Sequence, residues 1–384
     1  MQKEVTKKIA ILFTNYGPYH LSRLEAFHQS CQTHSWEVTG IELTRSGVDY
    51  QWKTTLEKIA CPIISLTSEE EFFHLSWHQL VRKLYRSLSK LDPDIIAISG
   101  YARPAMLAAL IWCQLHRKIA ILFSETHERD AKRIVWRERI KGAIVNQYDA
   151  ALVGGQPHQS YLEKLGFRSD RIFTGYDTVD NSVFHPQKNR SLPRPIQNHY
   201  FIAISRFIPK KNLAFLLDCY SQYRQKVKSD RAWDLVLCGD GELKAKIEQQ
   251  IRQLNLQECV RLPGFLQQNE LLPYLTHASC FIHSSTVEQW GLVVNEAMAS
   301  GLPVLVSKRC GCFEDLVVEG VNGFGFDPEN DQKLIDLMVR MSTQEMDLPK
   351  MGQAALEHIQ NFSPDRFASG LVAAIESAIN GEIT

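Results

Sequence analysis

At 384 residues the chain is too long for one hydrophobic core of ordinary size, so its length predicts two domains. Its 43 Lys and Arg residues balance 43 Asp and Glu residues, which excludes an overall electrostatic attraction to nucleic acid or to an anionic membrane. The 9 cysteines are odd in number and lie mostly in apolar segments, so we expect reduced thiols in a cytoplasmic protein and no disulfide framework.

Short apolar runs alternate with amphipathic segments through the first half of the chain. The runs are rich in Ile, Val and Leu and are closed by Gly or polar residues, which is typical of strands buried on both faces of a sheet. These expected strands are 8–15, 94–100, 118–125 and 150–155. Segment 76–91 carries apolar residues at helical spacing and is expected to be a helix. The alternation predicts a parallel sheet with helices on both faces.

A proline-rich, basic segment at 185–200 interrupts this pattern and is expected to link two domains. After it the alternation of strands and helices restarts. The expected strands of the second half are 200–207, 234–241, 259–265, 280–285 and 302–308. We therefore predict two doubly wound domains that face each other. Ligands of such sheets bind beyond the carboxyl ends of the strands, so we expect the active site in the cleft between the domains.

Membrane-spanning, secreted and metal-binding proteins each leave signals that this sequence lacks. No stretch reaches about 18 uninterrupted apolar residues, and the N-terminal apolar run is too short for a signal peptide. Cys310 and Cys312 form the one closely spaced cysteine pair, and no CxxC or HxxxH motif nearby completes a metal site. We expect no metal.

The stretch "EQWGLVVNE" places two carboxylates, Glu288 and Glu296, around an apolar run. In one continuous helix they would lie about 12 Å apart along the axis, too far to share a proton or a metal. A helix that begins near Gly291 fits the residues better, with Glu288 in the preceding loop and Glu296 in the second turn. The backbone N–H groups of Gly291, Leu292 and Val293 would then be free to bind a phosphate. A phosphate between two hydroxyl-binding carboxylates describes a nucleotide sugar.

The longer stretch "EQWGLVVNEAMASGLPVLVS" resembles the E-x7-E signature of the retaining GT-B glycosyltransferases of family 4, the glycosyl transferases group 1. The resemblance implies a GT-B fold, in which two Rossmann-like domains face each other across a cleft. It implies that Glu288 holds hydroxyls of the donor sugar and that Glu296 binds the ribose.

Other positions of the second half match the same family in order. Arg206 and Lys211 match its R-x4-K pair, which clamps the donor diphosphate; Lys210 competes with Lys211 for the second position, but the spacing favours Lys211. Gly239 lies in a match to the glycine loop of the nucleotide pocket, although Gly-Asp-Gly alone more often makes a plain turn. Leu266 lies in a match to the loop whose backbone contacts the base in this family. Because the backbone makes this contact, the side chains do not indicate which base is bound.

The first half matches the family less closely. Gly17 follows the first strand where the family brings backbone close to the phosphates, but the glycine could equally serve a turn. His127 follows a strand where the family often has a histidine near C6 of the donor sugar; the alternative is an ordinary histidine of a surface loop. Four charged neighbours could take its role: Glu125, Glu128, Arg129 and Asp130.

Segment 131–145 is a basic amphipathic stretch that contains Trp136. In family members that glycosylate lipids, such a patch can contact an anionic membrane or a pyrophosphate lipid. Its net basic charge is small, so a solvated helix face is the favoured interpretation.

The resemblance also sets the expected domains: an acceptor-binding domain at 1–186, a nucleotide-sugar-binding domain at 187–363, and a helix at 364–384 that crosses back to the first domain. The expected function is retaining transfer of a sugar from a nucleotide-diphosphate sugar, with UDP favoured over GDP, to a glycan, lipid-linked or small-molecule hydroxyl, most often in polysaccharide biosynthesis. We expect no metal or cofactor, no nucleic acid, and a cytoplasmic protein that could contact the inner membrane face. A sugar-nucleotide 2-epimerase of the same fold and a non-catalytic nucleotide-sugar-binding protein are the alternatives.

Overall fold

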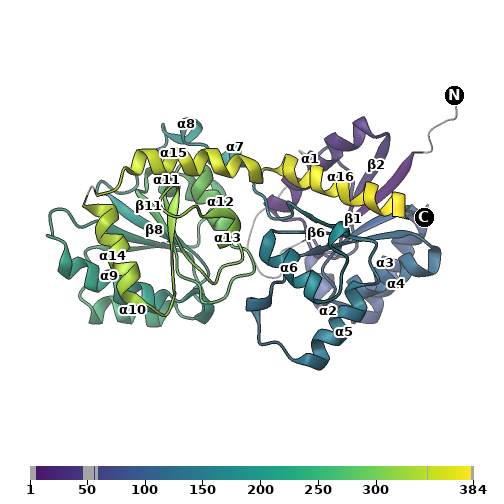
Figure 1. Ribbon diagram of the computed structural model, residues 1–384, viewed down its shortest axis with the longest axis horizontal. Coiled ribbons are helices and arrows are strands. Elements are labelled where there is room, and N and C mark those ends of the chain that lie inside the picture. Colours follow the sequence, from purple (N-terminus) through teal and green to yellow (C-terminus); the bar gives the residue numbers. More distant parts are fainter. Residues whose placement is uncertain (1–5, 46–55, 57–58, 344, 382–384) are drawn as a thin grey trace. The chain divides into compact units, whose positions relative to one another are not determined.

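The computed structural model describes residues 6–45, 56, 59–343 and 345–381 (Figure 1). The chain divides into two compact units. The first contains the chain up to Glu128, Lys132–Val179 and the segment from Phe362 onward, and the second contains Asp180–Asn361 together with Arg129–Ala131.

The first unit is built on a parallel sheet of 7 strands in the order β3-β2-β1-β4-β5-β6-β7. Its strands are β1 Lys7–Phe13, β2 Trp36–Glu42, β3 Ile63–Ser65, β4 Ile95–Ser99, β5 Ile119–Ser124, β6 Ala150–Val153 and β7 Ile172–Thr174. Its helices are α1 Pro18–Thr33, α2 Glu69–His74, α3 Trp77–Leu91, α4 Pro104–His116, α5 Val135–Val145, α6 Gln156–Lys164 and α16 Pro364–Gly381, with a short 3-10 turn η2 Ser169–Arg171. The 3-10 turn η1 Glu128–Asp130 contains residues of both units.

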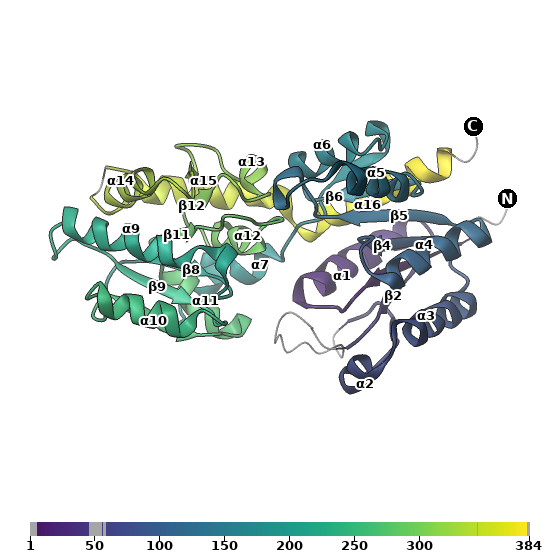
Figure 2. The same ribbon diagram turned by 90° about the horizontal axis from the view of Figure 1, so that it is seen from below.

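Both faces of this sheet are covered, which explains why β1, β4, β5 and β6 consist mainly of apolar residues. Along β1, Ile9 and Ile11 belong to a core shared with α1 and α16, whereas Ala10 and Leu12 belong to a core shared with α3 and α4. The C-terminal helix α16 packs against α1 and beside β6, as Figures 1 and 2 show. The expected helix at 76–91 is α3.

The second unit has a parallel sheet of 6 strands in the order β10-β9-β8-β11-β12-β13. Its strands are β8 Tyr200–Ile204, β9 Asp234–Cys238, β10 Val260–Gly264, β11 Cys280–His283, β12 Val304–Ser307 and β13 Gly323–Phe326. Its helices are α7 Asn181–Phe184, α8 Pro186–Asn189, α9 Leu213–Lys226, α10 Lys244–Gln253, α11 Gln268–His277, α12 Leu292–Ala299, α13 Phe313–Leu316, α14 Asp331–Ser342 and α15 Leu348–Ile359, with 3-10 turns η3 Pro209–Lys211 and η4 Gln360–Phe362.

The strand order of the second unit reverses direction between β8 and β11. In doubly wound sheets this switch point opens a crevice at the carboxyl ends of the two strands, where ligands bind. Helix α9 packs against α10 and α14, and α12 packs against α7 and α15. The loops after β8 and β11 are therefore the first place to look for a ligand site.

The chain passes from the first unit to the second between Val179 and Asp180, before the expected linker. The reason is local packing. Helix α7 contacts α12, and the Asn181 side chain donates a hydrogen bond to the carbonyl of Ile359 at 2.8 Å, so this segment already belongs to the second unit.

Candidate functional site

The segment that follows β11 has the predicted form. Helix α12 begins after Gly291, whose φ of 108° and ψ of 61° place it in left-handed backbone, and ends at Ala299. Glu288 lies in the loop before the helix, and Glu296 is buried in the second turn. Because Leu292 and Val293 are in the first turn, their N–H groups have no intrahelical acceptor and are available to an anion.

Contacts on both sides hold this loop in place. The Trp290 side chain is buried and donates from its indole N–H to Oδ1 of Asn295 at 2.9 Å. The carbonyl of Glu288 accepts a hydrogen bond from the N–H of Gly311 at 3.0 Å, and that of Trp290 accepts one from Cys312 at 3.3 Å. These bonds fix the backbone on which Glu288 is carried.

Glu288 is at the centre of a cluster of polar side chains. Its Oε2 atom accepts a hydrogen bond from Nζ of Lys211, lies 3.4 Å from Nε2 of His283, and accepts a hydrogen bond from the Ser285 hydroxyl at 3.2 Å. Its Oε1 atom lies 3.7 Å from Nζ of Lys210. The Glu288 side chain is 12% exposed and that of Lys211 is 9% exposed, so this ion pair is largely withdrawn from water.

The cluster keeps the Glu288 carboxyl ionised. Burial raises its pKa, but the hydrogen bond from His283 and the charges of Lys211 and Lys210 outweigh burial and hold the pKa well below its usual range. Burial also lowers the pKa of His283, so its imidazole is neutral at neutral pH. Glu288 is therefore an acceptor of hydrogen bonds, as sugar hydroxyls require, and a poor proton donor.

The loop after β8 brings the lysines to this carboxylate. Lys210 and Lys211 close the turn η3, and the Ser284 hydroxyl donates to the carbonyl of Lys211 at 2.9 Å. The N–H of Thr286 donates to the carbonyl of Lys210 at 2.9 Å. Lysines from the β8 loop and Glu288 from the β11 loop thus meet at the switch point of the sheet.

Arg206, Gly239 and Leu266 lie in loops at the same edge of the sheet, after β8, β9 and β10. Arg206 is half-buried, and Leu266 is half-buried between β10 and α11. Gly239 has φ of +140°, and a Cβ there would lie 1.8 Å from the carbonyl oxygen of Ser205. The close approach of these two backbones is therefore enough to require glycine at 239, whatever its role toward a nucleotide.

The two predicted residues of the first unit have different surroundings. Gly17 caps α1 with extended backbone, φ −78° and ψ 177°. A Cβ there would meet only the His20 ring at 3.8 Å, so neither φ nor crowding requires glycine. His127 is 1% exposed, so the alternative of a surface-loop histidine is wrong. Its ring meets that of His158 edge-on at 5.4 Å, and its carbonyl accepts a hydrogen bond from Arg133.

His283 and Ser285 were not predicted from the sequence as site residues. They form the polar end of "CFIHSS", a segment expected only as a strand. Polar residues at the carboxyl end of a buried parallel strand, a few positions before the glutamate motif, are the signal that would have found them.

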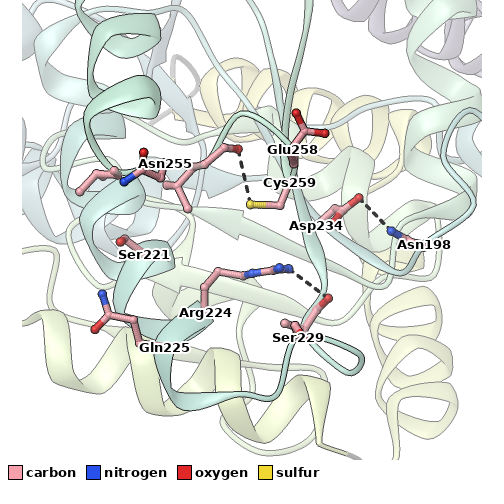
Figure 3. Close-up of a pocket in the computed structure, with 12 residues that line it drawn as sticks. Asn198, Ser221, Arg224, Gln225, Ser229, Asp234, Asn255, Glu258 and Cys259 are labelled. Atoms are coloured by element: carbon pink, nitrogen blue, oxygen red, sulfur yellow. Dashed lines mark hydrogen bonds between the residues drawn. The ribbon is translucent and has the colours of Figure 1, made fainter.

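A hollow of about 400 Å³ lies at the opposite edge of the same sheet (Figure 3). Asp234, the first residue of β9, and Cys259, just before β10, line it, and Nδ2 of Asn198 donates to Oδ2 of Asp234 at 3.3 Å. Because it opens at the amino ends of the strands, this hollow contains none of the predicted site residues.

Across the helices that the structure describes, none is long and apolar enough to span a membrane.

The architecture of the two units defines a class. Two Rossmann-like parallel sheets, with a C-terminal helix packed on the first unit, form the GT-B fold of glycosyltransferases. Residues 185–358, which include the Glu288 cluster, match the family model described as glycosyl transferases group 1.

Particular relatives agree with that class. The amylovoran biosynthesis glycosyltransferase AmsK of Erwinia amylovora is 24% identical over 243 residues, covering 62% of this chain and 55% of the relative. The D-inositol 3-phosphate glycosyltransferase of Corynebacterium glutamicum is 24% identical over 271 residues, covering 67% of this chain and 63% of the relative. The chain thus spans little more than half the length of the curated relatives that it matches.

Solved structures cover nearly the whole chain. That of Anabaena HepE in complex with UDP is similar with a TM-score of 0.75 and 19% identity, covering 96% of this chain and all of HepE. Sucrose-phosphate synthase of Thermosynechococcus elongatus is similar with a TM-score of 0.73 and 16% identity, covering 98% of this chain. The family model and the curated relatives are those of glycosyltransferases, and the solved structures share the fold of this chain.

Proposed function

We propose that this chain is a retaining glycosyltransferase that moves a sugar from a UDP-sugar to a hydroxyl of a glycan, a lipid-linked glycan or a small molecule. The observation that carries the proposal is the contact of Lys211 with Glu288 at the N-terminus of α12, inside the segment that matches the family model. Cations, a helix N-terminus and an ionised carboxylate together suit a diphosphate linked to a sugar.

The proposal gives each group at the diphosphate a separate task. Lys211 and Arg206 neutralise the charge that grows on the departing nucleotide, and the backbone N–H groups of Gly291, Leu292 and Val293 donate to its oxygens. Such fixed donors accelerate a reaction most when they point at charge that develops in the transition state.

The remaining residues would hold the two ends of the donor. Glu288 accepts hydrogen bonds from hydroxyls of the sugar, and Glu296 accepts them from the ribose. The backbone near Leu266 and Gly239 lies along the base. His127 would touch the sugar from the first unit. These roles follow the family resemblance, and the low pKa of Glu288 supports its role as an acceptor.

We further propose that transfer occurs on one face of the sugar. The bond from the acceptor oxygen to the anomeric carbon forms while the bond from that carbon to the diphosphate breaks, and the acceptor proton passes to the leaving phosphate oxygen. Because its pKa is held low, Glu288 is a weak base, which argues against it as the proton acceptor.

UDP is favoured as the nucleotide because Anabaena HepE, a structural neighbour, was solved with UDP and with UDP-glucose. Thermal stabilisation separates the candidates, since a ligand at 100 times its dissociation constant adds about 2.7 kcal/mol to the folded state. Stabilisation by UDP and not by GDP is expected. Stabilisation by GDP alone would reject the proposed donor.

The deciding experiment is sugar transfer itself. The protein is incubated with labelled UDP-sugars and a panel of hydroxyl acceptors, and the anomeric configuration of the product is read by proton NMR. An α-linked product from an α-linked donor supports retention. We expect Glu288→Ala to abolish transfer and Glu296→Ala chiefly to weaken UDP binding; full activity of the first variant would reject the assignment.

Incubation with the donor alone tests the alternatives. An epimerised nucleotide sugar would indicate a 2-epimerase, whereas slow hydrolysis is expected of a transferase. Binding without hydrolysis or transfer to any acceptor would indicate a non-catalytic nucleotide-sugar-binding protein. The residues that match the phosphate clamp, Arg206 and Lys211, argue against this last alternative.

We also propose that α5 contacts an anionic membrane surface. Three apolar side chains of α5 are largely exposed: Val135 at 71%, Trp136 at 58% and Ile140 at 52%. The exposed Arg137 and Arg139 lie on the same helix. Exposed apolar side chains beside cations are typical of a helix that lies in a lipid interface.

Sedimentation with vesicles tests this contact. We expect binding to phosphatidylglycerol vesicles, weak binding to phosphatidylcholine vesicles, and loss of binding in the Trp136→Ser variant. Equal binding of the wild type and of this variant would leave α5 as a solvated helix face.

A further inference from the structure

His283 is a buried polar residue in an apolar strand. It is the last residue of β11 and is 2% exposed. Two positions before it lies Phe281, whose ring is nearly parallel to the imidazole at a centroid distance of 6.1 Å. A buried imidazole is costly unless its nitrogens have partners, so its contacts indicate why a histidine occupies this position.

The imidazole fits between the carboxylate and the start of α12. Its Nε2 atom lies 3.4 Å from Oε2 of Glu288 and 3.3 Å from the Ser285 hydroxyl, which itself donates to the same Oε2 atom. The same Nε2 atom would lie 3.4 Å from a Cβ on Gly291. The ring therefore fills the space beneath the first turn of the helix.

The charge of the carboxylate determines which nitrogen of His283 carries the proton. An ionised carboxylate only accepts hydrogen bonds, so a neutral imidazole can bond to Glu288 only with the proton on Nε2. Burial lowers the pKa of His283, which keeps the ring neutral. Glu288 therefore receives a hydrogen bond from the ring without the burial of a charged imidazole beside it.

The lysines and the histidine hold Glu288 in different ways. Lys210 and Lys211 carry their charges on flexible four-carbon chains, and under the proposed function they are drawn to the diphosphate when the donor binds. His283 is held by the buried strand and has few rotatable bonds. When the lysines turn to the phosphates, His283 and Ser285 remain in contact with Oε2.

We propose that His283 is a positioning residue, which keeps the Glu288 carboxylate oriented to receive the hydroxyls of the donor sugar after the lysines have moved to the diphosphate. The inference rests on the proposed function, because it assigns a task to Glu288 in donor binding. It predicts that His283 affects recognition of the sugar and not of UDP.

Three variants of the full chain test the inference. His283→Leu removes the N–H donor and keeps an apolar side chain of similar bulk in the core. His283→Gln keeps an N–H donor at a similar distance from the backbone. His277→Leu is the matched control, because His277 also makes a side-chain contact, 2.9 Å to the carbonyl of Leu192, but lies at the end of α11.

The first measurement is the affinity of each variant for UDP and for UDP-glucose by calorimetry. For His283→Leu we expect UDP affinity within about twofold of the wild type and a loss of about tenfold in the additional affinity conferred by glucose, as for one charge-assisted hydrogen bond. His283→Gln should restore most of this loss, and His277→Leu should match the wild type in both affinities.

A double variant separates positioning from a general structural effect. In the Glu288→Gln background, His283→Leu should cause no further loss of glucose-dependent affinity, because the residue through which it acts has been changed. A loss of the same size in both backgrounds, or an equal loss for UDP and for UDP-glucose, would overturn the inference.

The second measurement needs no donor. Nitrogen NMR of labelled histidine in the wild type should detect a neutral ring with the proton on Nε2, and the signal should shift in Glu288→Gln. A proton on Nδ1 would overturn the inference. If Glu288→Gln binds UDP-glucose like the wild type, the proposed function fails; if only Glu288→Gln is impaired and His283→Leu is not, the inference about His283 alone fails.

Discussion

Replacing Gly291 by alanine tests whether the backbone before α12 controls the proposed donor site. Its φ of 108° lies well outside the left-handed well near +57°, which a non-glycine residue can still adopt. The added methyl group would also lie 3.4 Å from Cγ of Glu288 and 3.4 Å from Nε2 of His283, so both side chains must shift by a few tenths of an ångström. The substitution therefore strains the backbone and disturbs the carboxylate together.

The expected cost is about 1–3 kcal/mol for backbone held in a disfavoured region. For a unit of 150–250 residues each kcal/mol lowers the melting temperature by roughly 2–4 °C. Gly320→Ala is the control, because Gly320 has φ of +76° and a Cβ there would meet only the Phe324 ring, at 3.8 Å. Its cost should lie near the lower end of the range, and its effect on activity should be small.

Differential scanning calorimetry and transfer kinetics measured on both variants give the answer. We expect Gly291→Ala to melt lower than Gly320→Ala and to lose at least about tenfold in kcat/KM, which corresponds to about 1.4 kcal/mol. Equal melting temperatures, with transfer unchanged in both variants, would refute the argument that the backbone at Gly291 and the Glu288 carboxylate are mechanically linked.

Three further predictions follow from the charges and the burial of the second unit. Lys211→Met should weaken UDP binding by at least tenfold in calorimetry, and Lys210→Met should weaken it less, because the Lys210 side chain is 36% exposed, against 9% for Lys211, and water screens its charge more strongly. The low pKa of Glu288 means that its ionised form stabilises the fold fully above the unfolded-state value of about 4.3 and loses this effect as pH falls. The melting temperature of the wild type should therefore exceed that of Glu288→Gln most at pH 6, and the difference should shrink toward pH 3; a difference that grows on acidification would contradict the assigned contacts. Burial raises the pKa of thiols such as Cys31 to about 12, so a thiol reagent at pH 8 should react slowly with the native protein. In denaturant the thiols are exposed, and all 9 cysteines should react rapidly.

The features that could be predicted from the sequence are those that depend on local pattern. Apolar runs bounded by glycine or polar residues indicated β1, β4, β5 and β6 of the first sheet and β8 to β12 of the second, whereas β2, β3, β7 and β13 were not predicted. The start of α12 followed from Gly291 and the helix-forming residues after it. In α3 the pattern predicted the helix but not its buried face, because Trp77 and Tyr85 are 57% and 45% exposed. Apolar residues at helical spacing do not show how much of the helix surface packs against other elements.

The contacts at Glu288 could not be predicted in the same way. The pairing of Lys211 with Glu288 joins residues 77 positions apart, and it depends on β8 and β11 being neighbours in the sheet. The residue type at His283 is not informative alone, since one histidine at the end of an apolar strand is compatible with an ordinary core residue; only its position a few residues before the glutamate motif indicates a site. Strand order, which sets both contacts, is a property of the whole sheet and not of any short motif.

The hydrogen bond from Asn181 to the carbonyl of Ile359 has a consequence for the design of the chain. It joins the first helix of the second unit to the end of α15, so the two ends of that unit are adjacent. The second unit is thus an insertion, and the first is completed on either side of it by the segments that end at Val179 and begin at Phe362. Such an insertion can be exchanged as a cassette, so the corresponding unit of a relative could be spliced in at two neighbouring points without redesigning the first unit.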